Sequence, residues 1–389
     1  MTRSKNAALS KESHEPKVGA FFSNGETYFR LWAPFSRQVD LVLRDHHKLK
    51  SKLRMNHQPR GYHSLLTETK GVIDYAFVLD GKKETPDPAS QFQPDGVNGI
   101  SRTIDPSTFH WTDGDWKGAA KEDLTIYEIH VGTYTSDGTF ESIIPHLSYL
   151  RTTLGVTAIE LMPVGQFPGS RNWGYDGVFM FAPQNTYGGT AGLKKLVNAC
   201  HNEGLAVVMD VVYNHAGPEG NCLSHYGPYF SWKYKTPWGP AFNYDDFGSD
   251  AVRSYVIQNA IYWIEEFHID GLRLDAIHRI SDSSPQHLLL QIARQVHALE
   301  KSTLRPLHLI AESDLNDPKI LKPQSQGGYE IDAQWSDDFH HSVHAYFTGE
   351  RSHEYIDFGS LDNIAKAMNS AFVYDGKYSE FRGRTFGAS

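Results

Sequence analysis

The spacing of hydrophobic positions divides the chain into two parts. In the first part, apolar and polar residues alternate in short runs, at residues 27–33, 38–43, 62–66 and 74–79. The turn dipeptides beside these runs are Asn24-Gly25, Arg60-Gly61 and Asp80-Gly81. Alternation with a period of two buries one face of a strand, and turns at this spacing are typical of antiparallel sheets. We therefore predict a small antiparallel β-sandwich at residues 17–106.

From about residue 124 onwards, apolar strands alternate with helical segments. The expected strands are residues 124–131, 158–163, 206–212, 271–275, 308–311 and 330–334. The expected helices are residues 138–154, 189–203, 249–267, 285–300 and 339–348. This alternation is the signature of βα units around a parallel sheet. The predicted fold class is α/β, a (β/α)8 TIM barrel that is incomplete here, because about six strands can be counted and a closed barrel needs eight.

These patterns divide the chain into four segments. The polar residues 1–16 are expected to be a disordered tail, and the sandwich follows at 17–106. Residues 107–123 are expected to be a linker, and the barrel, lacking its last strands, occupies residues 124–389.

Charge and composition exclude several classes of protein. The 389 residues carry a formal net charge of −9 and no basic cluster, which disfavours nucleic-acid binding. No stretch approaches the roughly 20 apolar residues that span a bilayer, and the N-terminus lacks the apolar segment of a secretory signal. Only two cysteines occur, Cys200 and Cys222, so no disulfide framework is expected. The sequence thus predicts a cytoplasmic protein that contacts neither membrane nor nucleic acid.

Two of the expected strands end abruptly in a carboxylate. Residues 271–275 end at Asp275, and residues 308–311 are followed directly by Glu312. Because side chains alternate between the faces of a strand, Arg273 shares a face with Asp275. Barrel enzymes keep their chemistry at the carboxyl ends of the strands. Two carboxylates on such a scaffold form the machinery of glycoside hydrolysis.

A third run repeats this pattern and establishes a resemblance to a known family. Residues 205–215 are apolar and β-branched, and they close on Asp210, Asn214 and His215. With the runs around Asp275 and Glu312, this run resembles the motifs of the alpha-amylase family of glycoside hydrolases. The resemblance continues at residues 127–133, which contain His130, and at residues 172–177, which contain Tyr175. It covers nearly everything after about residue 124 and implies action on α-glucans.

The resemblance implies a role for each carboxylate. Asp275 is the expected nucleophile of a retaining mechanism, and Glu312 is the expected general acid/base. Carboxyl groups about 5 Å apart would form a covalent glycosyl-enzyme intermediate. Arg273 would stabilise the negative charge of Asp275, and the apolar residues before Glu312 would surround its carboxyl group. The alternative is that either carboxylate is only a structural ion-pair partner.

Other residues are implied to line the same pocket. His215 is expected to contact the sugar at the cleavage point, and Tyr175 is expected to be a stacking platform beside His130. Asp210 either touches substrate or only holds Arg273 in place. The twenty histidines form no His-Glu-x-x-His or comparable ligand set, so neither a metal site nor a cofactor is predicted.

Residues after the nucleophile point to one branch of the family. They are His278, three residues past Asp275, and the run Asp337, Asp338, Phe339, His340 and His341. This combination resembles members that release trehalose from the end of maltooligosyl-trehalose, which makes this α-glucan the expected substrate. All six are candidate substrate-binding residues, although Asp337 or Asp338 could instead cap the helix that follows.

One departure from the family pattern stands out. The family carries a third acidic residue, an aspartate preceded by histidine, and none of the twenty histidines here is followed by aspartate. We therefore expect that the sequence is a fragment, cut between the sixth and seventh barrel strands, which is inactive or nearly so by itself.

Alternative functions remain open at this point. Residues 28–34 resemble the N-terminal, immunoglobulin-like sandwich of branching and debranching enzymes, so the protein could belong to those enzymes. The missing aspartate would also suit a catalytically dead glucan-binding fragment. The sandwich either supports the barrel, which we favour, or binds glycan. The aromatic residues concentrated between positions 213 and 247 either pack on the barrel or touch sugar. The sequence gives no indication of the oligomeric state.

Overall fold

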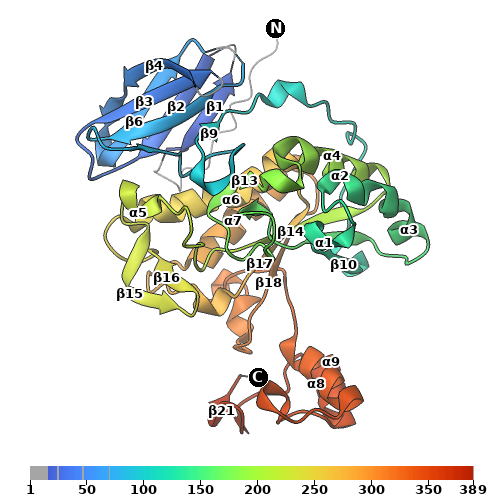
Figure 1. Ribbon diagram of the computed structural model, residues 1–389. Coiled ribbons are helices and arrows are strands. Elements are labelled where there is room, and N and C mark those ends of the chain that lie inside the picture. The colour runs from blue at the N-terminus through green and yellow to red at the C-terminus, as the bar shows by residue number, and fades with distance from the viewer. Residues whose placement is uncertain (1–15, 24–25, 46–47, 70, 389) are drawn as a thin grey trace.

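The computed structural model describes residues 16–23, 26–45, 48–69 and 71–388 (Figure 1). Except for Pro16, the expected N-terminal tail lies outside the described residues, as does the Asn24-Gly25 turn. The described residues form two antiparallel sheets, a six-stranded parallel sheet and a C-terminal lobe (residues 337–388) that Figure 1 shows below the main body. The predicted fold class, an incomplete (β/α) barrel preceded by antiparallel sheets, is confirmed.

The two antiparallel sheets follow the alternating runs of the N-terminal part. Their orders are β1-β2-β6-β5 and β4-β3-β7-β8, with β9 beside β7. The bounds are β1 Gly19–Ser23, β2 Glu26–Trp32, β3 Val39–Asp45, β4 Lys48–Arg54, β5 Asn56–Gln58, β6 Tyr62–Thr67, β7 Asp74–Leu79, β8 Glu84–Thr85 and β9 Ser101–Arg102. The four predicted runs became β2, β3, β6 and β7. The sequence pattern missed β4 because this lysine-rich edge strand is largely exposed on both faces.

The parallel sheet curls around the future site. Its order is β10-β11-β14-β17-β18-β19, which is also the order in the chain. The bounds are β10 Ile126–Ile129, β11 Ala158–Leu161, β14 Ala206–Val211, β17 Gly271–Leu274, β18 His308–Ala311 and β19 Ala333–Gln334. All six predicted strands are present, and β18 matches its prediction at both ends. Within the described ranges, the outer strands β10 and β19 each pair with a single neighbour, so the sheet is a half-barrel.

Helices and short hairpins fill the connections between these strands. The helices are α1 Val131–Tyr134, α2 Phe140–Ile143, α3 Leu147–Thr152, α4 Gly189–Asn202, α5 Leu223–Tyr226, α6 Ser249–Phe267, α7 Leu288–Thr303, α8 Asp337–Thr348 and α9 Leu361–Ser370. The remaining strands are β12 Gly165–Gln166, β13 Phe179–Pro183, β15 Phe230–Thr236, β16 Gly239–Phe242, β20 Lys377–Ser379 and β21 Arg384–Phe386. None of the helices in the described ranges has the length and apolarity required to cross a membrane.

Helix prediction succeeded where no proline intervenes. The predicted helix at residues 249–267 matches α6 at both ends. Residues 138–154 were predicted as one helix, but they form α2 and α3 with a 3-10 turn between them. Pro145 lies in that turn, and proline interrupts a helix because it has no N–H to donate.

The N-terminal sheets are fixed to the barrel by buried tyrosines. The Tyr226 hydroxyl donates to the carbonyl oxygens of Thr85 and Pro86, at 3.1 and 2.7 Å. The Tyr255 hydroxyl donates to the carbonyl of Pro88 at 2.8 Å. These are contacts between the barrel and the segment after β8, so they favour the interpretation that the sandwich supports the barrel.

The expected linker is anchored at the end of the barrel opposite the carboxyl ends of its strands. Asp113 Oδ2 lies 2.8 Å from His201 Nδ1 and 2.7 Å from His268 Nδ1. His201 also lies 2.9 Å from Asp270, whose other oxygen accepts from Trp116 Nε1 at 2.8 Å. The two imidazoles lower the pKa of Asp113, although its burial opposes them. In barrel enzymes this face serves stability rather than chemistry.

Removing this anchor is expected to destabilise the fold. Asp113→Ala would leave His201 and His268 without a shared acceptor, which should cost about 3 kcal/mol of unfolding free energy. The nearby exposed Asp115 makes no hydrogen bond with a described residue, so Asp115→Ala should change stability by less than about 0.5 kcal/mol. Urea unfolding of the two variants measures the difference, and equal stability would contradict the anchoring role.

The C-terminal lobe has its own small core. Buried apolar side chains of this core are Ala345, Phe358, Ala367, Val373, Tyr374 and Phe386. Asp338, at the start of α8, accepts from the backbone N–H groups of Val373 and Tyr374, at 2.6 and 3.0 Å. It also accepts from Asn316 Nδ2 at 2.7 Å, and Asn316 lies in the segment after β18. Asp338 therefore ties the lobe to the barrel.

Candidate active site

A single guanidinium group joins the carboxylates at the ends of three neighbouring strands. Arg273 Nη1 donates to Asp210 Oδ2 and to Asp275 Oδ1, both at 2.8 Å. Arg273 Nη2 lies 3.5 Å from Glu312 Oε2. Burial by itself would lower the pKa of Arg273, but its acidic neighbours raise it above the usual range, so the guanidinium stays charged. The structure thus brings the two predicted catalytic carboxylates to one cation.

The other oxygen of Asp275 is held by an asparagine. Asn214 Nδ2 donates to Asp275 Oδ2 at 3.0 Å and to the Asp275 carbonyl at 3.1 Å. The Asn214 amide oxygen in turn lies 2.5 Å from His215 Nδ1. Asp275, 8% exposed, therefore has both carboxylate oxygens fixed in orientation. No role was predicted for Asn214 from the sequence.

The position of Glu312 depends on a backbone turn directly after Asp275. Ala276 has φ 41° and ψ 51°, a left-handed conformation that is strained for a residue with a Cβ atom. In this conformation the Ala276 N–H donates to Glu312 Oε2 at 2.5 Å. The prediction of an apolar setting for the Glu312 carboxyl was wrong, because its contacts are this N–H and Arg273. Strain of this kind clusters at functional sites.

The buried Asp210 pairs with Tyr175, which is partly buried. The Tyr175 hydroxyl donates to Asp210 Oδ2 at 3.0 Å. Burial raises the pKa of Asp210 well above its usual range, and Arg273 opposes the shift. Burial and the charge of Asp210 raise the pKa of Tyr175 far above its usual range. The residue before Tyr175 must be glycine: Gly174 has φ +103°, and a Cβ there would lie 1.9 Å from the Pro163 carbonyl oxygen.

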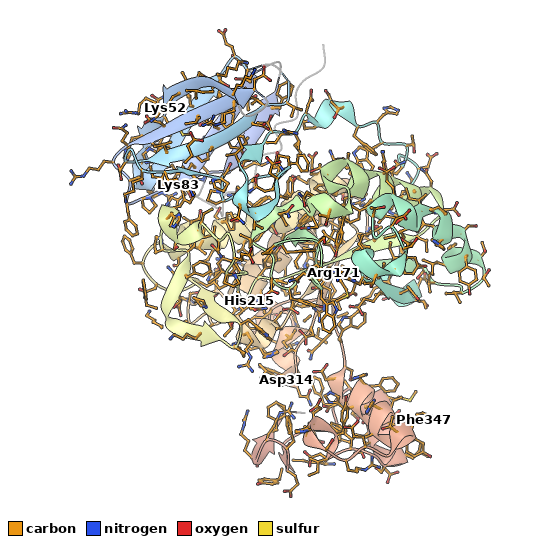
Figure 2. All side chains as sticks on the ribbon, in the orientation of Figure 1. Lys52, Lys83, Arg171, His215, Asp314 and Phe347 are labelled. Carbon is orange, nitrogen blue, oxygen red and sulfur yellow. The ribbon has the colours of Figure 1, made fainter. Side chains whose placement is uncertain are left out.

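The two histidines expected in the pocket differ in their surroundings. His215 lies inside the main body (Figure 2), and Trp238 stacks on it with ring centroids 5.1 Å apart. Burial lowers the pKa of His215, so its imidazole is neutral at pH 7. His130 uses both ring nitrogens locally: Nε2 lies 2.8 Å from the Asn172 carbonyl oxygen, and Nδ1 lies 2.8 Å from Thr133 Oγ1.

A polar cluster lies where the barrel meets the C-terminal lobe. Asp314 marks this junction in Figure 2, and it lies 3.2 Å from Arg382 Nη2 and 3.8 Å from His278 Nδ1. Burial, together with the charges of Glu312 and Asp314, raises the pKa of Asp337 to about 6. Of the polar run at the start of α8, Asp337 is therefore the residue whose pKa is affected by the charge of Glu312.

The rest of that run lies within the lobe. Asp338 is the tie described above, and His341 packs edge-on against Tyr355 and Phe358, with ring centroids 5.3 and 5.4 Å apart. Phe339 and His340 are exposed on α8. The alternative that Asp337 or Asp338 caps the following helix was wrong, because the N-cap of α8 is Ser336, whose hydroxyl accepts from the Phe339 N–H at 3.2 Å.

The aromatic segment divides into packing and exposed residues. Tyr226, Tyr229, Phe242 and Tyr244 are buried in the core. Trp232, Trp238 and Phe247 are exposed, by 96%, 50% and 73%. Only Trp238 among these three stacks on a predicted sugar-contacting residue, His215.

Two further functional candidates escaped the sequence analysis. Glu160 is a buried carboxyl on β11, and Arg382 approaches from the hairpin of β20 and β21. Glutamate in a short strand looks like a solvent-facing position, so no pattern marked Glu160. No group of three or more potential metal ligands occurs among the described residues.

Comparisons with known proteins agree with this geometry. The family profile described as "Alpha amylase, catalytic domain" matches residues 103–247. A solved structure described as an alpha amylase from Salmonella typhimurium is 40% identical, with a TM-score of 0.87 over 95% of this chain and 63% of that one. Residues 103–247 therefore match an alpha-amylase catalytic domain, in agreement with the resemblance.

Curated relatives narrow the comparison further. Proteins named malto-oligosyltrehalose trehalohydrolase are 53% identical in Saccharolobus solfataricus and 45% identical in Arthrobacter ramosus, over 93% and 92% of this chain. The protein is homologous to these trehalohydrolases. The chain spans 62% of the length of both relatives.

Proposed function

We propose that the gene product is a retaining glycoside hydrolase that releases trehalose from maltooligosyl-trehalose. The observation that carries the proposal is the Arg273 guanidinium, which holds Asp210 and Asp275 and lies beside Glu312. The names of the relatives support the choice of substrate. The proposal includes no cofactor. The cytoplasmic location and the segment boundaries stay predictions.

The proposed reaction has two steps. In the first, a carboxylate oxygen of Asp275 bonds to the anomeric carbon of the glucose next to trehalose, the bond from that carbon to the glycosidic oxygen breaks, and Glu312 gives its proton to the departing oxygen. In the second, Glu312 takes a proton from water, the water oxygen bonds to the same carbon, and Asp275 leaves as a carboxylate. Two inversions at one carbon give net retention.

Neighbouring residues have supporting roles in this proposal. Asp210 and Tyr175 hold Arg273 against Asp275, which keeps the nucleophile charged and oriented. Neutral His215 with Trp238 would contact the bound glucose, and His130 would shape the wall of the pocket. Asp337, whose pKa is affected by the charge of Glu312, would accept hydrogen bonds from hydroxyl groups of the departing trehalose. His278, which lies 3.8 Å from Asp314, would also contact the trehalose.

Product analysis tests the proposed substrate. Incubation of the full gene product with maltooligosyl-trehalose is expected to release free trehalose, whereas incubation with amylose should create no branch points. New branch points in amylose, without trehalose release, would support the branching alternative instead. Binding of either glucan without turnover would support the glucan-binding alternative.

The 389-residue polypeptide by itself is expected to release little trehalose. Unpaired backbone at the edges β10 and β19 invites association with other chains, and Tyr127 on β10 is 38% exposed. The measurement compares this polypeptide with the full gene product at equal concentration. Equal trehalose release from a monomeric 389-residue polypeptide would contradict the expectation, and Asp337 would then be the candidate third carboxylate.

A further inference from the structure

Glu160 is a buried acidic residue of the parallel sheet that has no part in the proposed reaction. It lies on β11 in register with Glu128 of β10 and Val208 of β14. Its side chain is on the face of the sheet that carries Asp210 and Arg273. Glu160 is level with Val208, which lies two residues nearer to the start of β14 than Asp210. Glu160 is 3% exposed, and its Oε2 has no hydrogen-bond partner among the described residues.

An unpaired carboxylate in such a place is costly. Burying a charge without a partner destabilises a fold, so the group tends to stay neutral. Burial and the like charge of Glu128 raise the pKa of Glu160 to about 7, while Arg273 opposes the shift. Arg273 is the cation whose charge acts on Glu160 in this balance, and its guanidinium already contacts Asp210, Asp275 and Glu312.

We propose that Glu160 is a positioning residue for Arg273. While Glu160 is neutral, the Arg273 guanidinium keeps its hydrogen bonds to Asp210 and Asp275, and when Glu160 ionises it draws the guanidinium away from them. Ionised Glu160 loosens the hold on the nucleophile, so activity falls. The groups that face it are Glu128 on β10, Asp210 on β14 and Arg273 on β17, with Glu312 beyond β18. The proposal rests on the proposed function for the role of Asp275.

The pH dependence of kcat/KM in Glu160→Gln tests the proposal. Glutamine keeps the shape of the side chain and cannot ionise. The ratio of variant to wild-type kcat/KM should be near one at pH 5.5 and rise to about tenfold at pH 8, because a group with a pKa near 7 is then about one-tenth protonated. A ratio that does not change with pH would overturn the proposal.

The matched control is Glu128→Gln. Removing the like charge on β10 favours ionisation of Glu160, so the alkaline fall of wild-type activity should move to lower pH. In Glu160→Gln the alkaline fall caused by Glu160 is absent, so adding Glu128→Gln to this variant should not move the alkaline limb that remains. If Glu160 acted only through its negative charge, both single variants would move the alkaline fall in activity to lower pH. A move of the fall to higher pH in Glu160→Gln would instead indicate that Glu160 competes for Arg273.

Thermal melting separates this inference from the proposed function. The pKa of Glu160 is raised from its ordinary value of 4.5 to about 7, so its burial destabilises wild type increasingly between these two values and constantly above them. The melting temperature of Glu160→Gln should therefore exceed that of wild type by a margin that grows from pH 4.5 to 7 and then levels. Glu160→Met, also neutral, serves if the glutamine variant folds poorly. A pH-independent difference would overturn the inference, whichever glucan the enzyme cleaves.

Discussion

Asp275→Asn is expected to lower kcat on maltooligosyl-trehalose by about 10⁴-fold or more, with the fold intact. An amide oxygen cannot replace the carboxylate as nucleophile, and loss of a nucleophile removes most of the catalytic advantage of an enzyme. The amide keeps the size of the side chain, its one oxygen can still accept from Arg273, and Asn214 Nδ2 keeps the backbone carbonyl of residue 275 as an acceptor. Binding of the substrate should therefore change little. The measurements are steady-state kinetics, glucan affinity and thermal melting.

The control for this substitution is Asp115→Asn. Asp115 is exposed in the segment before the barrel, so the same chemical change there should leave kcat unchanged. Near-normal turnover in Asp275→Asn would remove Asp275 from the nucleophile role. A loss of activity accompanied by a collapsed melting transition would instead place Asp275 in the structural ion pair with Arg273.

Glu312→Gln is expected to impair substrates according to their leaving groups. Cleavage of maltooligosyl-trehalose needs protonation of a poor leaving group, so kcat should fall by about 10³-fold. In a maltosyl fluoride the leaving group is fluoride, which departs without needing a proton. The first step on that substrate should therefore be slowed by less than about tenfold. Glutamine can still accept the Ala276 N–H through its amide oxygen, which preserves the local geometry. Rates on both substrates test this difference.

Equal losses on the two substrates would contradict the role of Glu312 as acid. They would indicate that Glu312 acts through its contacts with Arg273 and with the turn at Ala276, as an orienting group.

The sequence predicted most of the fold because the barrel elements carry strong patterns. Residues 249–267 form a long, largely buried helix, and residues 309–311 are apolar and precede the polar residues Glu312 to Asp314, so both elements were predicted with the right limits. The N-terminal strand β4 escaped because it has no buried face. The break between α2 and α3 was not predicted, although the sequence contains Pro145 at this point and proline interrupts helices.

The site could be predicted only as far as local spacing reaches. Arg273 and Asp275 share a face because they lie two residues apart on one strand, and the structure confirms that they touch. The surroundings of Glu312 depend on Ala276 in the turn after β17, and no sequence pattern marks the left-handed conformation of this residue.

Distant contacts also decided the roles of the neighbouring aspartates. Asp337 and Asp338 look alike in sequence, but the backbone N–H groups of residues 373 and 374 satisfy only Asp338. Glu160 is buried because neighbouring strands curl inward around it, which depends on the whole sheet.

The covalent intermediate gives the most direct test of the central claim. Glu312→Gln in the full gene product, mixed with a maltooligosyl fluoride, should form the intermediate and hydrolyse it slowly, because the general base is missing. Peptide mass spectrometry of the quenched protein is predicted to find the added glycosyl mass on the peptide that contains Asp275. The contradicting result is an unlabelled Asp275 peptide during turnover, with the product sugar released in the inverted anomeric configuration.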